Sequence, residues 1–229
     1  MNWKEHDQWN LKTFIALMIL EFGVVVWGVK YIMSPFYDRW LNNDFYAGIL
    51  IGLTITIILM LGIYFIALRP NNLTWRAVGI KPMARQDWKR VILYTIVLMI
   101  GTVIITLITS LIGGSWENSK TDAVQENITI MTVLIAFISA AIISPIYEEI
   151  FYRGFIYRWL RTRIGFKGAL ILSALIFAVA HIPTYNTVPV AFFAGIIFAL
   201  AYERTQSILP SMLIHGLSNG IMILLTSLG

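Results

Sequence analysis

The sequence SPIYEEIFYR at residues 144–153 places two adjacent carboxylates and an arginine at the end of a long apolar stretch. Glu148, Glu149 and Arg153 are costly there, because a charged side chain at the centre of a bilayer costs at least about 2.5 kcal/mol. The apolar stretches that follow contain further polar residues at His181, His215 and Asn219. Since such residues persist mainly where they pair, line a cavity or take part in chemistry, these three groups predict one functional site.

The composition is that of an integral membrane protein. Of the 229 residues, 58% are hydrophobic and 13% are charged, whereas soluble domains carry about 25% charged residues. The mean hydropathy is +0.76. Stretches that can approach or cross a hydrocarbon core of about 30 Å lie at 11–33, 45–68, 91–112, 129–147, 169–180, 188–202 and 208–228. We therefore expect an all-α, polytopic transmembrane bundle of about seven helices, with eight as the upper count.

The first apolar stretch is expected to remain as a helix, because it lacks the short apolar core and small-residue cleavage site of a signal peptide. The chain contains no cysteine, which excludes disulfides and thiolate sites.

The net charge of +5 is explained by membrane topology rather than by a nucleic-acid partner. Fourteen Lys and Arg residues flank helix ends on one expected face, including those of the loop 69–90, and only Arg39 and Lys120 fall on the other. Basic residues concentrate on the cytoplasmic side of membrane proteins. The N-terminus is therefore expected inside the cell, and the polar loop 113–127 outside.

The depth of the polar groups fixes the length of the fourth helix. If that helix ended at Tyr147, Glu148 and His181 would lie on opposite sides of the membrane. If it continues to about Arg161, Glu148 lies 13 residues before the basic turn, which is about 20 Å at 1.5 Å per residue. His181 lies 13 residues after Gly168 on the next helix, again about 20 Å from the same face.

His215 and Asn219 reach a similar depth, about 12 and 18 Å from the turn that precedes the last helix. All these groups are therefore expected in one layer at mid-membrane. Pro145 can kink the fourth helix just before the carboxylates. A ridge of small residues on that helix would let another backbone approach; it consists of Ala136, Ala140 and Ser144.

Spacing along the helix separates the two acids by role. Glu149 and Arg153 are four residues apart, so they share a helix face and are expected to neutralise each other. Glu148 lies about 100° around the helix, where it can face another partner and suits general acid–base chemistry. Taken singly, the acids could mark a helix end, His181 a membrane interface, and His215 with Asn219 an interhelical hydrogen-bonded pair. The shared depth favours a functional site.

Two more intramembrane residues carry charge. Glu21 in the first helix has no ionisable partner at helical spacing, and we leave this buried acid unassigned. Lys30 lies nearer the end of the same helix, where it is expected to extend its ammonium to the interface.

Three motifs, in order, resemble those of the CPBP family, which contains the type II CAAX prenyl endopeptidases and bacteriocin-processing or self-immunity proteins and is also called the Abi family. The motifs are Glu148-Glu149-xxx-Arg153, Phe177-xxx-His181 and His215-xxx-Asn219. The likeness covers roughly residues 128–229, a CPBP-like core. Residues 1–127 resemble the family only in forming membrane helices and loops, and the whole is expected to be one integral membrane domain.

The resemblance implies an intramembrane endopeptidase of a bacterial cell membrane that hydrolyses a membrane-embedded or membrane-associated peptide or protein. By position, Glu148 and His181 would activate the water, and His215 and Asn219 would stabilise the oxyanion or complete the site. Glu149 and Arg153 would support Glu148. The alternative is a bacteriocin self-immunity protein on the same scaffold, with or without proteolysis.

Two versions of the chemistry stay open. With a divalent ion such as Zn²⁺, Glu148, His181 and His215 would be the ligands, and the ion would lower the pKa of its bound water toward about 7. Against this, no helix carries the His-Glu-xx-His spacing, and the amide of Asn219 would be a poor zinc ligand. Without metal, Glu148, oriented by His181, is the base, while His215 and Asn219 donate hydrogen bonds to the tetrahedral intermediate. The ligand chemistry favours the metal-free version.

Overall fold

The computed structural model describes residues 3, 8–112 and 128–228. Within these residues the chain is helical and has no strand, and six helices are long and apolar enough to cross a membrane. They span Leu11–Leu41, Asp44–Asn71, Asp87–Leu111, Ile130–Val179, Tyr185–Thr205 and Leu209–Ser227. The predicted fold class, an all-α transmembrane bundle, is confirmed, and the protein is an integral membrane protein. The predicted outer loop 113–127 lies outside the described residues.

Several of these spans combine α-helical with wider or tighter turns. The first is α1 (Leu11–Ile19), π-helical η2 (Leu20–Met33) and α2 (Ser34–Leu41); the second is α3 (Asp44–Gly62), η3 (Ile63–Leu68) and η4 (Arg69–Asn71). After the 3₁₀ turn η5 (Trp75–Val78) comes α4 (Asp87–Leu111). The fourth span is α6 (Ile130–Phe137), η6 (Ile138–Ile143), α7 (Ser144–Glu148), η7 (Glu149–Tyr157) and α8 (Arg158–Val179), followed by η8 (Tyr185–Thr187), α9 (Val188–Thr205) and α10 (Leu209–Ser227).

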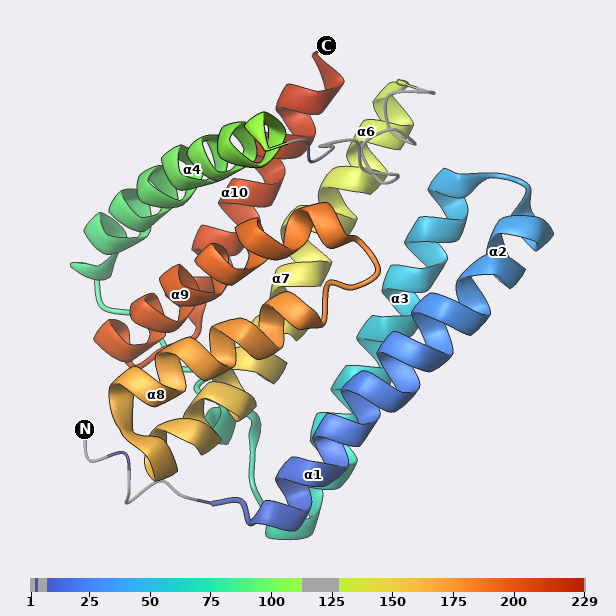
Figure 1. The fold of residues 1–229 in the computed structure, drawn as a ribbon. Coiled ribbons are helices and arrows are strands. Elements are labelled where there is room, and N and C mark those ends of the chain that lie inside the picture. Colours follow the sequence, from blue (N-terminus) through green and yellow to red (C-terminus); the bar gives the residue numbers. More distant parts are fainter. Residues whose placement is uncertain (1–2, 4–7, 113–127, 229) are drawn as a thin grey trace.

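The fourth span doubles back on itself, as Figure 1 shows where the yellow helix turns into α8. The reversal is at Gly165, whose φ of 76° and ψ of −176° lie in a region that a side chain disfavours. The reversal divides one of the six long helices of the described residues into two limbs, which gives seven limbs, the number predicted. The helix also continues past Tyr147 to the basic turn, as the depth argument required.

The first helix is longer than predicted. It was expected to end at Met33 but continues through α2 to Leu41. The added turns carry Pro35 in their first turn, where proline's missing N–H costs little. None of their residues is buried, so apolar content alone could not reveal them.

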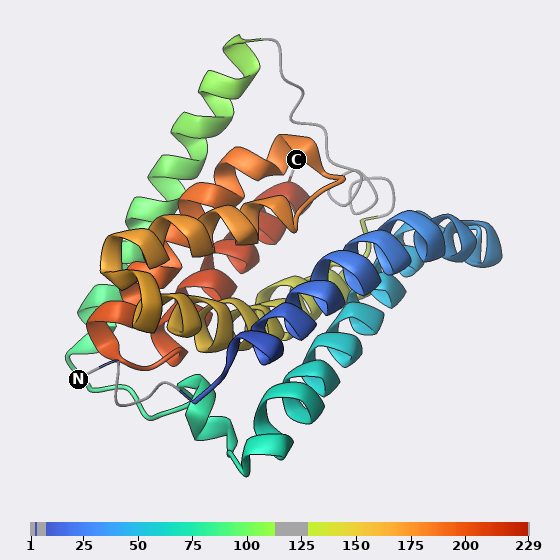
Figure 2. The same cartoon turned by 60° about the horizontal axis from the view of Figure 1, so that its bottom comes forward.

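The helices form two groups. The pair made by α1–η2–α2 and α3 lies on one side, and α4 lies on the opposite side of the central helices α8, α9 and α10 (Figures 1 and 2). The element η7 is buried at all nine positions. The segment that carries the charged motif is therefore central to the fold.

The end of the bundle that carries the basic turns is tied together by contacts between its connections. Arg158 donates to the carbonyl of Ala77, and Ser207 Oγ donates to the carbonyl of Lys81 at 2.6 Å. Arg163 donates to the carbonyl of Trp9 at 2.7 Å. The loop 69–90 is therefore packed against the fourth span near its reversal and against the turn after the fifth span, and it covers this end.

Candidate active site

The helix is wound unusually around the two glutamates. The α-helical turns of α7 lie between two π-helical segments, η6 and η7. Pro145 lacks an N–H and cannot donate to the carbonyl of Ala141, four residues earlier, so a normal α-helical ladder is interrupted here. Widened turns of this kind are frequent at functional sites, and the kink at Pro145 stays a prediction.

Gly216 allows α10 to approach the widened segment. A Cβ at this position would collide with the carbonyl oxygen of Ala141, so only glycine permits the contact. The approach brings the preceding residue, His215, against Glu148 and Glu149. A close approach of another helix was predicted here, but it centres on Ala141 rather than on the predicted ridge of Ala136, Ala140 and Ser144.

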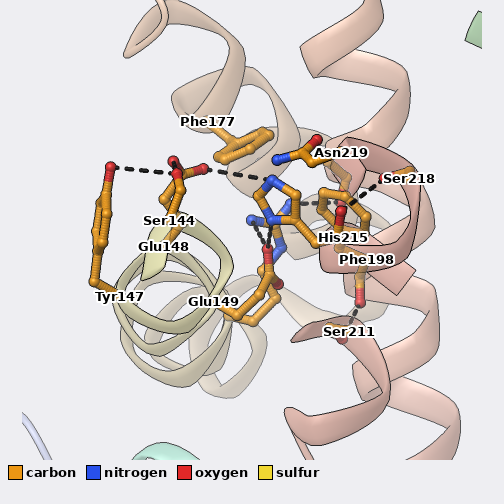
Figure 3. Close-up of polar contacts among 12 residues, drawn as sticks. Ser144, Tyr147, Glu148, Glu149, Phe177, Phe198, Ser211, His215, Ser218 and Asn219 are labelled. Atoms are coloured by element: carbon orange, nitrogen blue, oxygen red, sulfur yellow. Dashed lines mark hydrogen bonds and ion pairs between the residues drawn. The ribbon is translucent and has the colours of Figure 1, made fainter. Parts of the chain in front are cut away.

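Glu149 lies at the centre of a buried triad with Arg153 and His215, shown in part in Figure 3. Its Oε1 is 3.3 Å from Arg153 Nη1 and 3.0 Å from His215 Nδ1. Glu149 is 0% and Arg153 1% exposed. The predicted Glu149–Arg153 pair is present, and His215 is a second partner that helical spacing could not reveal.

Aromatic rings surround the arginine of this triad. The guanidinium carbon of Arg153 lies 4.3 Å from the ring centre of Phe177 and 4.9 Å from that of Phe198. Arg153 Nη2 also donates to the carbonyl of Gly195 at 3.3 Å. Because a planar cation stacks on ring faces, the guanidinium is held in one orientation and fixes Glu149 in turn.

Glu148 points in a different direction from Glu149. Its Oε2 is 3.9 Å from His215 Nε2, and its Oε1 accepts a hydrogen bond from Ser144 Oγ. Ser144 Oγ is also 3.4 Å from the Tyr147 hydroxyl. His215 therefore lies between two carboxylates and stacks on Phe198, with ring centres 4.6 Å apart (Figure 3).

Glu148 and His181 line the same cavity, whose volume is about 490 Å³. His181 follows α8, and its Nδ1 is 2.8 Å from the carbonyl oxygen of Phe177. Since a carbonyl can only accept, Nδ1 carries the proton in this bond, and Nε2 is the basic nitrogen of the neutral ring. His181 can therefore orient or accept a proton within the cavity.

Asn219 is nearby but makes a structural contact. Its Nδ2 donates to the carbonyl of Ala140 at 2.9 Å, which ties α10 to η6. The predicted group of Glu148, His215 and Asn219 is thus assembled around one stretch of the fourth span. The catalytic roles assigned to them remain predictions.

Two residues of the first helix line the cavity, and the sequence motifs gave neither of them a role in the site. Glu21 is 1% exposed and accepts a hydrogen bond from the Tyr152 hydroxyl at 2.7 Å. The ammonium of Lys30 donates to the carbonyl of Ala180 at 2.5 Å, and its extension to the membrane interface stays a prediction. Both partners belong to other helices, so no spacing within the first helix could have indicated them.

The arrangement of the candidate ligands decides whether the site fits a metal ion. Among the described residues, no group of three or more His, Cys, Asp or Glu side chains is arranged to hold one ion. The predicted ligand set Glu148, His181 and His215 therefore does not form a metal site in this arrangement.

Comparison with known proteins supports the resemblance read from the motifs. Residues 129–221 match the model of the Rce1-like type II CAAX prenyl endopeptidases. The membrane-embedded CAAX protease MroQ of Staphylococcus aureus is 31% identical over 137 residues, which cover 57% of this chain and 54% of MroQ. The UPF0177 protein YaiH of Lactococcus lactis is 33% identical over 88 residues, or 38% of this chain and 36% of YaiH.

The predicted resemblance to the CPBP family is confirmed for this part of the chain. The matched segments span about half the length of MroQ and about a third of YaiH. No solved structure gave a significant match. Glu21 and Lys30 lie outside the region that the family model covers.

Proposed function

We propose that this protein is an intramembrane endopeptidase that activates a water molecule with Glu148. The main support is that Glu148 and His181, from different limbs of the bundle, line one cavity between the membrane-spanning helices. A carboxylate and an imidazole in one cavity can take a proton from water and return it, which side chains that face lipid cannot do. The similarity of residues 129–221 to type II CAAX prenyl endopeptidases agrees with this chemistry.

In the proposed reaction, Glu148 takes a proton from the water as its oxygen attacks the carbonyl carbon of the scissile peptide bond. His181, through Nε2, orients the same water. The tetrahedral intermediate then expels the amine as its C–N bond breaks, and Glu148 returns the proton to the amine nitrogen. Atoms and charge balance without any further reactant.

His215 is proposed to stabilise the negative charge that develops in this reaction. Its Nε2 lies 3.9 Å from Glu148, and its Nδ1 contacts Glu149 Oε1 at 3.0 Å, so the ring is held between the two carboxylates. Donors that are fixed before the reaction stabilise an oxyanion most strongly. The stacking of Arg153 and His215 on Phe198 supplies that rigidity. Asn219 is proposed to complete the site by holding α10 at Ala140.

The mechanism uses no metal ion, in keeping with the arrangement of donors. Purified protein treated with EDTA is expected to keep its cleavage rate, measured together with its zinc content. A loss of cleavage that added Zn²⁺ restores would show this version of the mechanism to be wrong.

The function is tested by comparing membrane peptides from bacteria that express the wild type, Glu148→Gln or His181→Ala. New peptide termini, detected by mass spectrometry, are expected with the wild type and reduced by about 10²–10⁴-fold in Glu148→Gln, the usual value of a general base. Glu203→Gln is the matched control. Glu203 lies away from the cavity, and it pairs with Arg161 at a distance of 2.9 Å. Equal cleavage by wild type and Glu148→Gln at equal expression would refute the proposal.

The same variants address the immunity alternative. Protection against a bacteriocin that survives both Glu148→Gln and His181→Ala would indicate immunity without proteolysis. We further propose that 128–229 is the catalytic core, that the first two spans cover one side of the cavity, and that the N-terminus is cytoplasmic, following the distribution of basic residues.

A further inference from the structure

The central cavity extends far beyond the carboxylate and histidine of the proposed site. From Glu148 and His181 it continues between the first two spans and the fourth to Asp38 and Asp44, near the hairpin that joins α2 to α3. Its volume of about 490 Å³ is in the range of sites that enclose a ligand, about 300–1,000 Å³.

The wall formed by α3 leaves space for a polypeptide backbone. The space lies at Gly48, where an added Cβ would meet nothing within 4 Å, whereas a Cβ at Gly52 would already contact Ser139 Oγ at 3.9 Å. Both glycines line the cavity, and Ser139 lines the facing wall. Small residues on both walls let a backbone approach closely, so the passage suits an extended segment better than a bulky head group.

The charged residues that line the cavity are mainly acidic. The first span contributes Glu21, Lys30, Ser34 and Asp38, and Asp44 begins α3. The ammonium of Lys30 donates to the carbonyl of Ala180, which directs it toward the α8 terminus. Toward the far end the charged lining groups are Asp38 and Asp44, so that end favours a cation.

Glu21 adds an independent sign of a polar ligand. The side chain is 1% exposed, and it lines the cavity. Its Oε1 accepts from Tyr152, whereas its Oε2 is buried without a hydrogen-bond partner in the protein. A buried carboxylate oxygen of this kind is costly unless something donates to it, and the N–H groups of a bound peptide are suitable donors.

We propose that this cavity is the substrate channel, and that it takes an extended peptide segment with a lysine or arginine that reaches Asp38 and Asp44. This inference rests on the proposed function, because it assumes that the segment is cut beside Glu148. An acyl chain is a poorer occupant, since a lipid tail offers no donor to Glu21 and no charge to the two aspartates.

The length of the first span sets the expected position of the basic residue. Tyr152, which contacts Glu21, lies one turn nearer the basic end of the bundle than Glu148. Asp38 lies 17 positions after Glu21, toward the opposite end. The distance from the level of Glu148 to Asp38 is then about 20 Å along the helix. An extended chain rises about 3.3 Å per residue, so the basic residue is expected about six residues from the scissile bond.

The test uses reconstituted protein and quenched fluorogenic peptides that share one apolar segment. They carry Lys, Gln or Glu about four to eight residues from its centre, on either side. Wild-type protein is expected to cleave the best-placed Lys peptide about tenfold faster than its Glu counterpart. Asp38→Lys with Asp44→Lys should reverse this preference. Arg39→Gln, a charge change at the same end but outside the cavity lining, should leave it unchanged.

Binding is measured separately by placing the photo-crosslinker benzoylphenylalanine at Gly48 in the Glu148→Gln background. Crosslinking to the Lys peptide in preference to the Glu peptide is expected, whether or not a peptide is cleaved. Equal cleavage of all peptides, or no charge preference in crosslinking, overturns the channel and leaves the proposed function intact. Cleavage that persists in Glu148→Gln overturns the proposed function instead.

Discussion

Replacing Arg153 with methionine is predicted to destabilise the bundle by about 3–5 kcal/mol, the usual cost of breaking one side of a buried ion pair. Arg153 and Glu149 are 1% and 0% exposed, so water cannot replace the lost partner. Methionine keeps apolar contact with Phe177 and Phe198 but cannot neutralise Glu149 or donate to Gly195. Glu149 would then keep only His215, at 3.0 Å, as a basic neighbour.

The double variant Glu149→Gln with Arg153→Met separates charge from packing. Removing both charges of a buried pair is often close to neutral, so the double variant is expected to be about 1–3 kcal/mol more stable than Arg153→Met alone. Glu203→Gln serves as the control. Its partner Arg161 lies 2.9 Å away, and their side chains are 15% and 22% exposed, so a loss of about 1 kcal/mol or less is expected.

Reversible unfolding in mixed micelles of increasing SDS content, followed by tryptophan fluorescence, measures these free energies of unfolding. A free energy of unfolding for Arg153→Met within about 1 kcal/mol of the wild-type value would refute the predicted role of the buried pair. A double variant no more stable than Arg153→Met would refute it as well, because packing alone would then explain the loss.

Three further changes test the local geometry in the same unfolding assay. Gly216→Val is expected to cost about 1–3 kcal/mol by forcing the backbones of α10 and η6 apart, and wild-type stability would exclude the close contact at Ala141. Gly165→Ala is expected to cost at least about 1 kcal/mol because of its positive φ, and an unchanged midpoint would contradict the reversal there. Tyr152→Phe is expected to cost about 1–3 kcal/mol by leaving Glu21 without its donor; Glu21→Gln in that background should recover part of the loss, and no recovery would count against the bond.

The fold was predictable from sequence because depth in a membrane can be counted along a helix. The requirement that Glu148 meet His181 forced the fourth helix past Tyr147 and placed a reversal near the basic residues, which the structure has at Gly165. The end of the first helix was not predictable in this way. Its last turns are exposed and polar, so they carry no signal of hydropathy.

The site was predictable only where its contacts follow helical spacing. Glu149 and Arg153 are one turn apart on one helix, and their pairing follows directly from that interval. The partners of Glu21 and Lys30 lie on other helices, so their identity depends on how the first span packs. The contact between His215 and Glu149 likewise depends on the approach of α10 at Gly216, which no pattern within either helix specifies.

Hydrolysis inside a membrane needs water and a polar peptide backbone at a depth where unsatisfied N–H and C=O groups cost several kcal/mol each. The basic end is covered by the loop that Arg158 and Ser207 hold at Ala77 and Lys81. Among the described residues, the cavity instead extends toward Asp38 and Asp44. The charged lining of the cavity therefore continues away from the packed basic end. The acids of the first span, outside the region matched by the family model, are therefore where we expect substrate preference to be set.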